Sequence, residues 1–175
     1  MTFGACGVRW PLALLAGSLA ALGWAALTTS PPRLVYNASD SVPVGLYRIS
    51  SAGSLAPGDL VLVRLPPEAR WLAAQRGYLP ANVPLLKTVA AMAPQRVCTR
   101  GGQVRIDGVV VARRMRWDQQ GRALPDWQSC RRLVGDELFL LSSNNPASFD
   151  SRYFGPVSAD AVIGRAQPLW LESRR

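Results

Sequence analysis

The 175-residue sequence contains no histidine, and only one of its twenty basic residues, Lys87, is a lysine. The lack of histidine excludes the arrangement in which an imidazole takes the proton from a nucleophilic serine. The other nineteen basic residues are arginines, which stay protonated and therefore cannot accept a proton. A lysine can act as a base once burial lowers its pKa. Lys87 is therefore the main side-chain candidate for a general base.

Cysteine is also scarce, with only Cys6, Cys98 and Cys130 in the chain. Two cysteines in the body without any histidine cannot form a normal tetrahedral zinc site, so we expect no metal, and nothing in the sequence indicates a cofactor. Cys98 and Cys130 lie 32 positions apart, and an oxidising compartment would permit them to pair. Such a disulfide would contribute roughly 3–4 kcal/mol of stability on the chain-entropy model. Two buried free thiols are the alternative.

Residues 12–30 form an uncharged apolar run that follows Arg9. As a helix, this run would be roughly 28 Å long, close to the hydrocarbon thickness of a bilayer. We expect one transmembrane helix with its amino terminus inside, according to the positive-inside rule. A signal peptide cleaved near residues 23–25 is one alternative, and a buried helix of a cytosolic protein is another.

This helix divides the predicted chain into two parts. Residues 1–30 form a cytoplasmic tip, which contains Cys6, and a membrane anchor or signal peptide, whereas residues 31–175 form one exported domain. The predicted location is the inner (cytoplasmic) membrane, crossed once, with the domain in the periplasm. The domain is long enough to bury a single core, and with 49% hydrophobic and 18% charged residues the chain has a globular composition.

The body is predicted to be mainly β. Its strand candidates are short apolar runs beside turn residues. They lie at residues 45–50, 57–65, 103–112, 136–143 and 158–171. Asp107-Gly108 between two apolar runs indicates a hairpin, and the last strand is expected to close the sheet. The one predicted helix of the body covers residues 66–77, with proline early and glycine at its end.

The net charge of +9 is concentrated in arginines, several of them in residues 112–132 together with Trp117 and Trp127. Arginines interleaved with aromatic residues can indicate nucleic-acid binding. The segment also contains Asp118 and Asp126, and it lies in the exported part. We therefore expect a solvated loop near anionic lipid headgroups, and no nucleic-acid partner.

Two features favour a Ser–Lys catalytic pair. The stretch YNASDSVPVGLYRIS, residues 36–50, places two serines, Ser39 and Ser41, beside turn-forming residues. Lys87 is flanked by leucine and valine, which can desolvate its ammonium group and supply a neutral amine. A neutral Lys87 within hydrogen-bond reach of Ser41 would activate that serine. A lysine that extends to solvent or pairs with a carboxylate is the alternative.

Three blocks of the sequence resemble the type I signal peptidases, most closely the TraF-type conjugative-transfer branch. They are NASDSVPVGLY (37–47), PLLKTVAAMAP (84–94) and SSNNPASFDSRYFGPV (142–157). Their order and spacing agree with the family over nearly the whole chain. The resemblance implies a signal-peptidase-like β fold after the N-terminal helix.

The resemblance also assigns roles to single residues. Ser41 matches the nucleophile, and Lys87 matches the general base. The backbone N–H of Ser41 would contribute to the oxyanion hole, assisted by the hydroxyl of Ser39. Ser148 matches the serine that orients the lysine amine.

Asp150 and Arg152 belong to the last of the three blocks. They lie two positions apart, so on a strand they would share one face. The resemblance implies that Asp150 is catalytically important, whereas a structural salt bridge with Arg152 is the alternative.

The implied function is that of a membrane-anchored serine endopeptidase that processes a pilin precursor for a conjugative type IV secretion system, with pilin cyclisation in some members. The family holds its substrate as an extended strand with small side chains before the cut. The partners would be the pilin precursor or another signal-peptide-bearing substrate, the lipid bilayer and the secretion machinery.

Three alternatives to this function remain. They are a general type I signal peptidase, a non-catalytic pilus assembly factor, and an exported β domain that binds acidic ligands through its arginines. The sequence departs from the housekeeping signal peptidases, because LSSNNPAS (141–148) replaces their G-D-N run and V-P-V-G replaces M-x-P-T. Both departures favour the conjugative branch.

Overall fold

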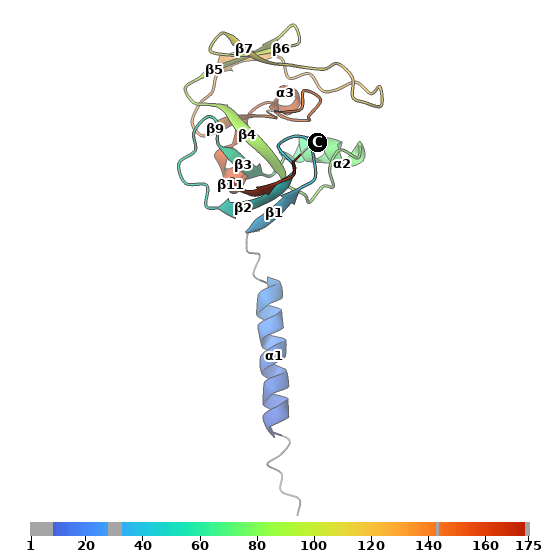
Figure 1. Ribbon diagram of the computed structural model, residues 1–175, viewed down its shortest axis with the longest axis vertical. Helices are drawn as coiled ribbons and strands as arrows, with labels where there is room; N and C mark the ends of the chain where they lie inside the picture. Colours follow the sequence, from blue (N-terminus) through green and yellow to red (C-terminus); the bar gives the residue numbers. More distant parts are fainter. Residues whose placement is uncertain (1–8, 28–32, 143, 174–175) are drawn as a thin grey trace, which may run out of the picture. The chain divides into compact units, whose positions relative to one another are not determined.

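The computed structural model of the protein describes residues 9–27, 33–142 and 144–173. The chain divides into two compact units, one within residues 1–32 and the other within residues 33–175 (Figure 1). The first unit contains one helix, and the second contains two antiparallel sheets and short helices. The body is therefore mainly β, as its short apolar runs and turns predict.

The helix of the first unit, α1, spans Arg9–Leu27 and has 19 residues. It begins and ends three residues earlier than the predicted run 12–30, so it includes Arg9. Among the residues that the structure describes, no helix is long and apolar enough to cross a membrane. The predicted helix is thus confirmed, but its assignment as a membrane span is not. Residues 28–30 and Cys6 lie outside the described residues.

The larger sheet of the body has seven antiparallel strands in the order β1-β2-β11-β3-β4-β9-β10. They are β1 (Leu34–Asn37), β2 (Gly45–Ser50), β3 (Leu60–Val63), β4 (Leu85–Met92), β9 (Glu137–Leu141), β10 (Val157–Ser158) and β11 (Val162–Leu171). The strands predicted within residues 45–50, 57–65 and 136–143 are confirmed as β2, β3 and β9. Strands β3 and β9 bury residues on both faces, which places the core at the middle of this sheet.

The predicted C-terminal strand is confirmed as β11, but it does not close the sheet at an edge. It lies in the interior between β2 and β3, where Ala166 pairs with Ile49 of β2. Gly164 permits this close insertion, because a Cβ there would lie 2.2 Å from the carbonyl oxygen of Ser50. The apolar pattern predicted that β11 is a strand. Which strands lie beside it depends on the close packing of Gly164 against β2, which the pattern does not contain.

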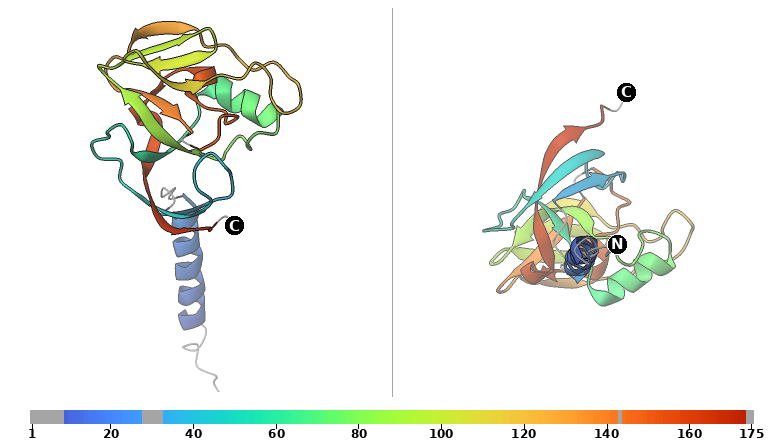
Figure 2. Two further views of the ribbon diagram at one scale, coloured as in Figure 1. Left: turned by 45° about the horizontal axis from the view of Figure 1, so that its top comes forward. Right: turned by 90° about the horizontal axis from the view of Figure 1, so that it is seen from below.

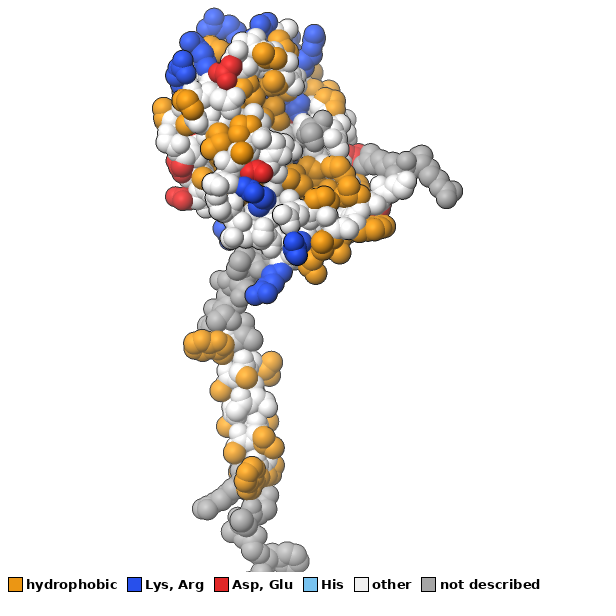
Figure 3. Space-filling model, turned by 60° about the vertical axis from the view of Figure 1, so that its left-hand side comes forward, with side chains coloured by type: hydrophobic (Ala, Val, Ile, Leu, Met, Phe, Trp, Pro, Cys, Tyr) orange, Lys and Arg blue, Asp and Glu red, His pale blue; other side chains and the backbone are white. Residues whose placement is uncertain are grey.

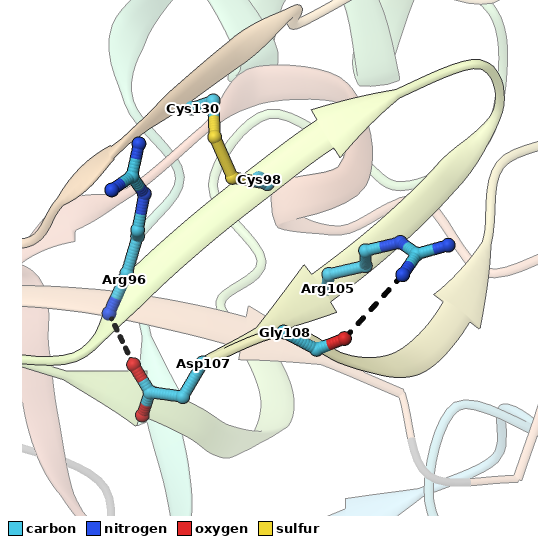
Figure 4. The surroundings of a disulfide bond; sticks show 6 residues. All are labelled: Arg96, Cys98, Arg105, Asp107, Gly108 and Cys130. Atoms are coloured by element: carbon cyan, nitrogen blue, oxygen red, sulfur yellow. Dashed lines mark hydrogen bonds between the residues drawn. A yellow bond between two sulfur atoms is a disulfide. The ribbon is translucent and has the colours of Figure 1, made fainter.

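The smaller sheet has four antiparallel strands in the order β7-β6-β5-β8 and is inserted in the chain between β4 and β9. They are β5 (Arg96–Arg100), β6 (Gln103–Ile106), β7 (Val109–Arg113) and β8 (Ser129–Arg132). The predicted hairpin is confirmed, with Asp107 and Gly108 at φ 48° and 88° in its turn. Cys98 and Cys130 are directly opposed on β5 and β8, and the predicted disulfide joins them (Figure 4).

One hydrophobic cluster joins the two sheets. Val97 and Val104 of the small sheet pack with Ala91 of β4 and Phe139 of β9, and all four are fully buried. The inner face of the small sheet is therefore packed against the large sheet. Figure 1 shows β5, β6 and β7 at the opposite end of the body from β1 and β2. The outer face of the small sheet consequently remains accessible to solvent.

The predicted helix of the body is confirmed as α2, Pro67–Gln75. It has proline in its first turn, and Gly77 at φ 70° follows its end. The connection between β7 and β8 passes beside this end (Figure 2), where Arg76 Nη1 donates to the carbonyl oxygen of Ala123 at 2.8 Å. The remaining helices are α3 (Ser151–Phe154) and the 3-10 helix η1 (Ala159–Ala161).

Candidate active site

The turn between β1 and β2 carries both predicted serines and is organised by Asn37. The side-chain nitrogen of Asn37 donates to the carbonyl oxygens of Ser39 at 2.8 Å, Val42 at 3.0 Å and Pro43 at 3.2 Å. The amide oxygen accepts bonds from the backbone nitrogen of Ser39 at 3.2 Å and from its hydroxyl at 2.8 Å. One buried side chain thus satisfies backbone groups that the bent chain cannot pair with a strand.

The hydroxyl oxygens of Ser39 and Ser41 are 2.8 Å apart. Ser39 donates its only hydroxyl hydrogen to the Asn37 amide oxygen, which can only accept. Ser41 must therefore donate its own hydrogen to Ser39. The proton of Ser41 has to leave this bond before a base can take it.

Gly45 and Tyr47 fix the path of the chain from this turn into β2. A Cβ on Gly45 would lie 2.2 Å from the carbonyl oxygen of Trp170 in β11, so only glycine fits there. The Tyr47 hydroxyl donates to the carbonyl oxygen of Pro43 at 2.6 Å. These contacts explain why two positions of the G-L-Y motif hold a glycine and a tyrosine.

Lys87 lies in β4 opposite Val61 of β3 and is only 1% exposed. Its Nζ is hydrogen-bonded to the hydroxyl of Ser148. Burial lowers the pKa of Lys87 from 10.5 to about 8; the Asp150 carboxylate opposes this lowering, and the Arg152 guanidinium adds to it. With such a pKa, about a tenth of the lysine is neutral at pH 7 and available as a base.

Asp150 and Arg152 form a buried, two-pronged ion pair. Arg152 Nε donates to Oδ1 of Asp150 at 2.8 Å, and Nη2 donates to Oδ2 at 2.7 Å. The prediction that these residues share a strand face is wrong, because Asp150 is the N-cap of α3. Its carboxylate accepts the backbone N–H of Arg152 at 3.2 Å, a local bond that favours a helical turn over a strand.

Arg152 also holds the loop that carries Ser148. Its guanidinium donates to the carbonyl oxygens of Pro146 at 2.7 Å, Asn145 at 3.2 Å and Ser148 at 3.2 Å. Because Ser148 is bonded to Lys87, the ion pair determines where the lysine amine is held. Both members of the pair are almost completely buried.

Ser142 connects the ion pair to the nucleophile turn. Its backbone nitrogen donates to Oδ2 of Asp150 at 2.9 Å. Its hydroxyl donates to the carbonyl oxygen of Ser41 at 2.6 Å and accepts from the backbone nitrogen of Asn145 at 3.0 Å. Neither Ser142 nor Asn37 was predicted as a site residue. Both lie inside the motif blocks 37–47 and 142–157, which is the only signal that the sequence offers for them.

A cavity of about 400 Å³ brings the predicted residues together. Ser39, Ser41, Lys87 and Ser148 all line it, whereas Asp150 and Arg152 do not. Its other lining side chains include apolar ones from Leu65, Ala73, Leu79, Leu85, Met115 and Phe149. No three acidic or cysteine side chains cluster as a metal site in the described parts of the chain. The cavity thus offers an apolar wall beside a hydroxyl and an amine.

Part of the predicted solvated basic segment forms another wall of this cavity. Trp117 and Ala123 form a β-bridge that closes a small hairpin between β7 and β8. Asp118 at its tip accepts bonds from Arg122 Nε at 2.7 Å and from the hydroxyl of Tyr78 at 2.5 Å. The hydrogen bond from Tyr78 and the bonds from Arg122 hold the pKa of Asp118 well below its usual range, although the burial of its carboxyl opposes them. The hydrogen bond from Tyr78 to Asp118 and the contacts of Arg76 with Asp118 and Ala123 hold this segment against the body, which the charge count could not predict.

The comparison with known families agrees with the resemblance on which these site residues were selected. The family model for signal peptidase, peptidase S26, matches residues 8–171, and the chain belongs to this family. Members of the family are generally serine peptidases, and the predicted resemblance is thereby confirmed.

Several relatives carry names from conjugation. A probable conjugal transfer protein TraF from Sinorhizobium fredii is 38% identical over 145 residues, covering 76% of this chain and 74% of that protein. The conjugal transfer protein TraF of Agrobacterium fabrum is 34% identical, with 77% and 80% covered. The plasmid transfer protein TraF of Escherichia coli is 34% identical, with 76% and 80% covered. The chain is thus related to the TraF proteins over most of its length.

Among solved structures, a signal peptidase I from Enterococcus faecalis overlaps 66% of this chain and 98% of that one. The identity is 22% and the TM-score 0.41, a likeness too slight to support an argument.

Proposed function

We propose that this protein is a serine endopeptidase in which Ser41 is the nucleophile and Lys87 the general base. The observation that carries the proposal is the burial of Lys87 beside the cavity that Ser41 also lines. The only lysine of the chain is buried, has a pKa lowered to about 8, and lines the same cavity as Ser41. The fold has no stabilising reason to bury a single ammonium group, because burying a charge costs free energy.

The reaction begins when the Ser41 hydroxyl turns from Ser39 toward the neutral amine of Lys87. Ser41 Oγ attacks the scissile carbonyl while Lys87 takes its proton, and a tetrahedral intermediate forms. The leaving amine then receives that proton from Lys87, and an acyl-enzyme remains on Ser41. Water, deprotonated by Lys87, attacks the ester and regenerates both side chains.

The nucleophile turn would stabilise the negative oxygen of the intermediate. The backbone N–H of Ser41 and the hydroxyl of Ser39 are the proposed donors. Ser39 donates to Asn37 in the resting state, so its hydroxyl must rotate to reach the substrate. The Asn37 bonds keep the backbone of the turn in place during this rotation.

We assign Asp150 a positioning role. Its carboxylate contacts Arg152 and Ser142, which in turn hold the Ser148 loop and the carbonyl group of Ser41. Its charge also limits how far burial lowers the pKa of Lys87. A direct catalytic role for Asp150 stays a prediction.

The proposed substrate is a pilin precursor of a conjugative system. The names of the TraF relatives refer to conjugal and plasmid transfer and support the conjugative system. The apolar cavity beside Ser41 suits small apolar side chains of an extended substrate. The Cys98–Cys130 disulfide favours an oxidising compartment, so we place the domain outside the cytoplasm.

The first test compares wild type with Lys87→Arg in cells that also express a candidate pilin precursor. Mass spectrometry of the precursor would report its size and cleavage position. Arginine keeps the charge but cannot accept a proton, so we expect processing to fall by at least about a thousandfold. Arg70→Lys, an exchange at an exposed position, serves as the matched control and should process normally. Unchanged cleavage by folded Lys87→Arg would refute the Ser–Lys mechanism.

The pH dependence of cleavage gives a second test. Only neutral Lys87 can act as a base, so kcat/KM should rise about tenfold per pH unit below pH 8 and level off above it. The expected midpoint follows from the lowered Lys87 pKa of about 8. A rate that stays flat from about two pH units below this midpoint to about one unit above it would exclude Lys87 as the base.

A further inference from the structure

The outer face of the small sheet is strongly basic. In the register of the sheet, Cys98 of β5 lies directly opposite Cys130 of β8 and Arg105 of β6. The side chains of these three residues therefore lie on the same face of the sheet, which is the outer one. The arginines that share it by register and alternation are Arg96, Arg100, Arg105, Arg113 and Arg132. The four strands contain no acidic residue. Figure 3 shows basic side chains gathered at this end of the body, with apolar ones between them.

Two guanidinium groups of this face donate hydrogen bonds to neutral groups: Arg105 to Gln103 and Gly108, and Arg132 to the carbonyl oxygen of Pro94. None of its arginines forms an ion pair with a described carboxylate. Asp107 in the β6–β7 turn accepts the backbone N–H of Arg96 (Figure 4). It also accepts a hydrogen bond from the side-chain amide of Gln95, and the charge of Arg132 contributes to the lowering of its pKa, after these two hydrogen bonds. Arg96 is directly opposite Arg132, and like charges at such positions destabilise a sheet. The positive charges of this face therefore have no ion-pair partner among the described carboxylates.

Beside this face lies an open strand edge. Strand β7 is the last strand of its sheet, and its three valines, Val109, Val110 and Val111, are 65%, 44% and 46% exposed. In the two-residue hairpin, Ile106 and Val109 close the turn, so the next pair, Arg105 and Val110, is not hydrogen-bonded. The N–H and carbonyl groups of Val110 therefore point away from β6, toward the open edge. Edge strands are usually protected by charges, proline or a β-bulge; the register shift of β7 falls at Val111, and the two valines before it, Val109 and Val110, carry no charge and are not proline.

We propose that the open edge of β7 and the arginine face together bind an extended, acidic segment of a partner protein. The segment would add a strand beside β7 through backbone hydrogen bonds. Its apolar side chains would cover the valines, and its acidic side chains would reach the arginines. A membrane or a nucleic acid would use only the positive charges, whereas the exposed valine edge requires a peptide backbone. Charge complementarity and the open edge thus favour a protein partner.

This surface lies outside the cavity of the proposed catalytic site, which it meets at the backbone carbonyl oxygen of Arg113, the acceptor of a 3.2 Å hydrogen bond from Arg152 Nη1. No residue of β5, β6, β7 or β8 lines the cavity that contains Ser41 and Lys87. The inference therefore does not depend on the Ser–Lys mechanism. Substitutions on this face should leave the cleavage of a short peptide substrate unchanged, which separates a failure of this proposal from a failure of the proposed function.

The test uses the purified full-length chain and a labelled peptide of about twelve residues that alternates glutamate and valine. Fluorescence anisotropy would measure its affinity for wild type and for the triple variant Arg96→Gln/Arg100→Gln/Arg105→Gln. We expect about tenfold weaker binding by the variant, as the sum of three partly screened charge pairs. The control variant removes the same charge from exposed, unpaired positions elsewhere in the body. Its substitutions are Arg33→Gln, Arg64→Gln and Arg70→Gln.

The control should bind the peptide within about twofold of wild type, because distant exposed charges are screened by salt. Equal losses in the two triple variants would show that only net charge matters and would overturn the proposal. Val110→Pro removes the outward N–H without changing charge, so it should also weaken binding about tenfold, whereas Val110→Ala should not. Wild-type affinity in Val110→Pro would exclude strand addition.

Two other probes test the competing partners. Vesicles containing phosphatidylglycerol and a short DNA duplex would be titrated against the same variants. Tighter binding of either probe than of the peptide, lost in the face variant, would overturn the proposal in favour of lipid or nucleic acid. Weaker binding of both would support a protein partner.

Discussion

The two sheets of this protein use arginine in opposite ways. In the large-sheet part, Arg152 is 2% exposed and bonds to the Asp150 carboxylate and to loop carbonyl groups. In the small sheet, Arg96 and Arg100 are exposed and have no carboxylate partner among the described residues. The first kind of arginine organises the site, and the second kind is available to another molecule.

The same contrast applies to the chemistry of the two sheets. The buried residues next to the cavity include a lysine whose pKa is lowered, an ion pair and a serine that connects them. The small sheet is stabilised by its disulfide and by its packing on Phe139 and Ala91. Function and stability are therefore partly separated, and substitutions in the two sheets should have different consequences.

The largest expected effect is that of Arg152→Met, which leaves the Asp150 carboxylate buried without its cation. The free energy of unfolding should fall by about 3–5 kcal/mol, measured by urea denaturation. The double variant Asp150→Asn/Arg152→Met should recover much of this loss, because the uncompensated charge is removed. A loss below about 1 kcal/mol in the single variant would contradict the role of the ion pair.

The next effect concerns the disulfide of the small sheet. Cys98→Ser/Cys130→Ser should lower the free energy of unfolding by about 2–4 kcal/mol, because the unfolded chain regains freedom. The variant should still cleave a substrate at temperatures where it stays folded, since neither cysteine lines the cavity. Wild type treated with a reductant is the control and should show the same shift. Loss of cleavage by the folded variant would show that the two sheets are coupled.

Lys87→Met should raise the free energy of unfolding by about 1–3 kcal/mol at pH 7 while abolishing cleavage. The pKa of Lys87 is lowered from 10.5 to about 8, so the unfolded chain binds more protons between these values. The stability of wild type should therefore rise with pH across this window, and the advantage of the variant should shrink. Thermal denaturation of both proteins at several pH values would measure this difference. An advantage that stays constant with pH would contradict the lowered pKa.

The smallest effect is expected for Arg100→Gln, the exposed counterpart of Arg152. The free energy of unfolding should change by less than about 0.5 kcal/mol, because no described partner is lost. The same denaturation measurement applies. A loss of more than about 1 kcal/mol would show that this surface arginine contributes to the fold.

Several elements could be predicted because their signals are local. The Asp107-Gly108 turn requires positive φ angles, which these residues tolerate, so the hairpin was evident. Helix α2 has proline at its start and glycine after its end. Lys87 and Ser41 were selected by elimination and by motif, and the structure places both at one cavity.

Other features were missed because they depend on contacts between distant segments. Ser142 joins Asp150 to the carbonyl group of Ser41, which is 101 positions away. The hairpin around Asp118 folds onto the end of α2 through Tyr78 and an arginine. No pattern within either segment specifies such a partner.

The sequence by itself determined which side-chain chemistry is available: without histidine and with one lysine, Lys87 is the main side-chain candidate for a nitrogen base. It also determined the local turns and strands, whose signals lie within a few residues. Only the tertiary structure decided that Lys87 is buried and that its pKa is lowered. It also decided the interior position of β11 and an arginine face without ion pairs to any described carboxylate. The physical reason is that burial and charge pairing depend on neighbours in space, which the packing of distant strands alone supplies.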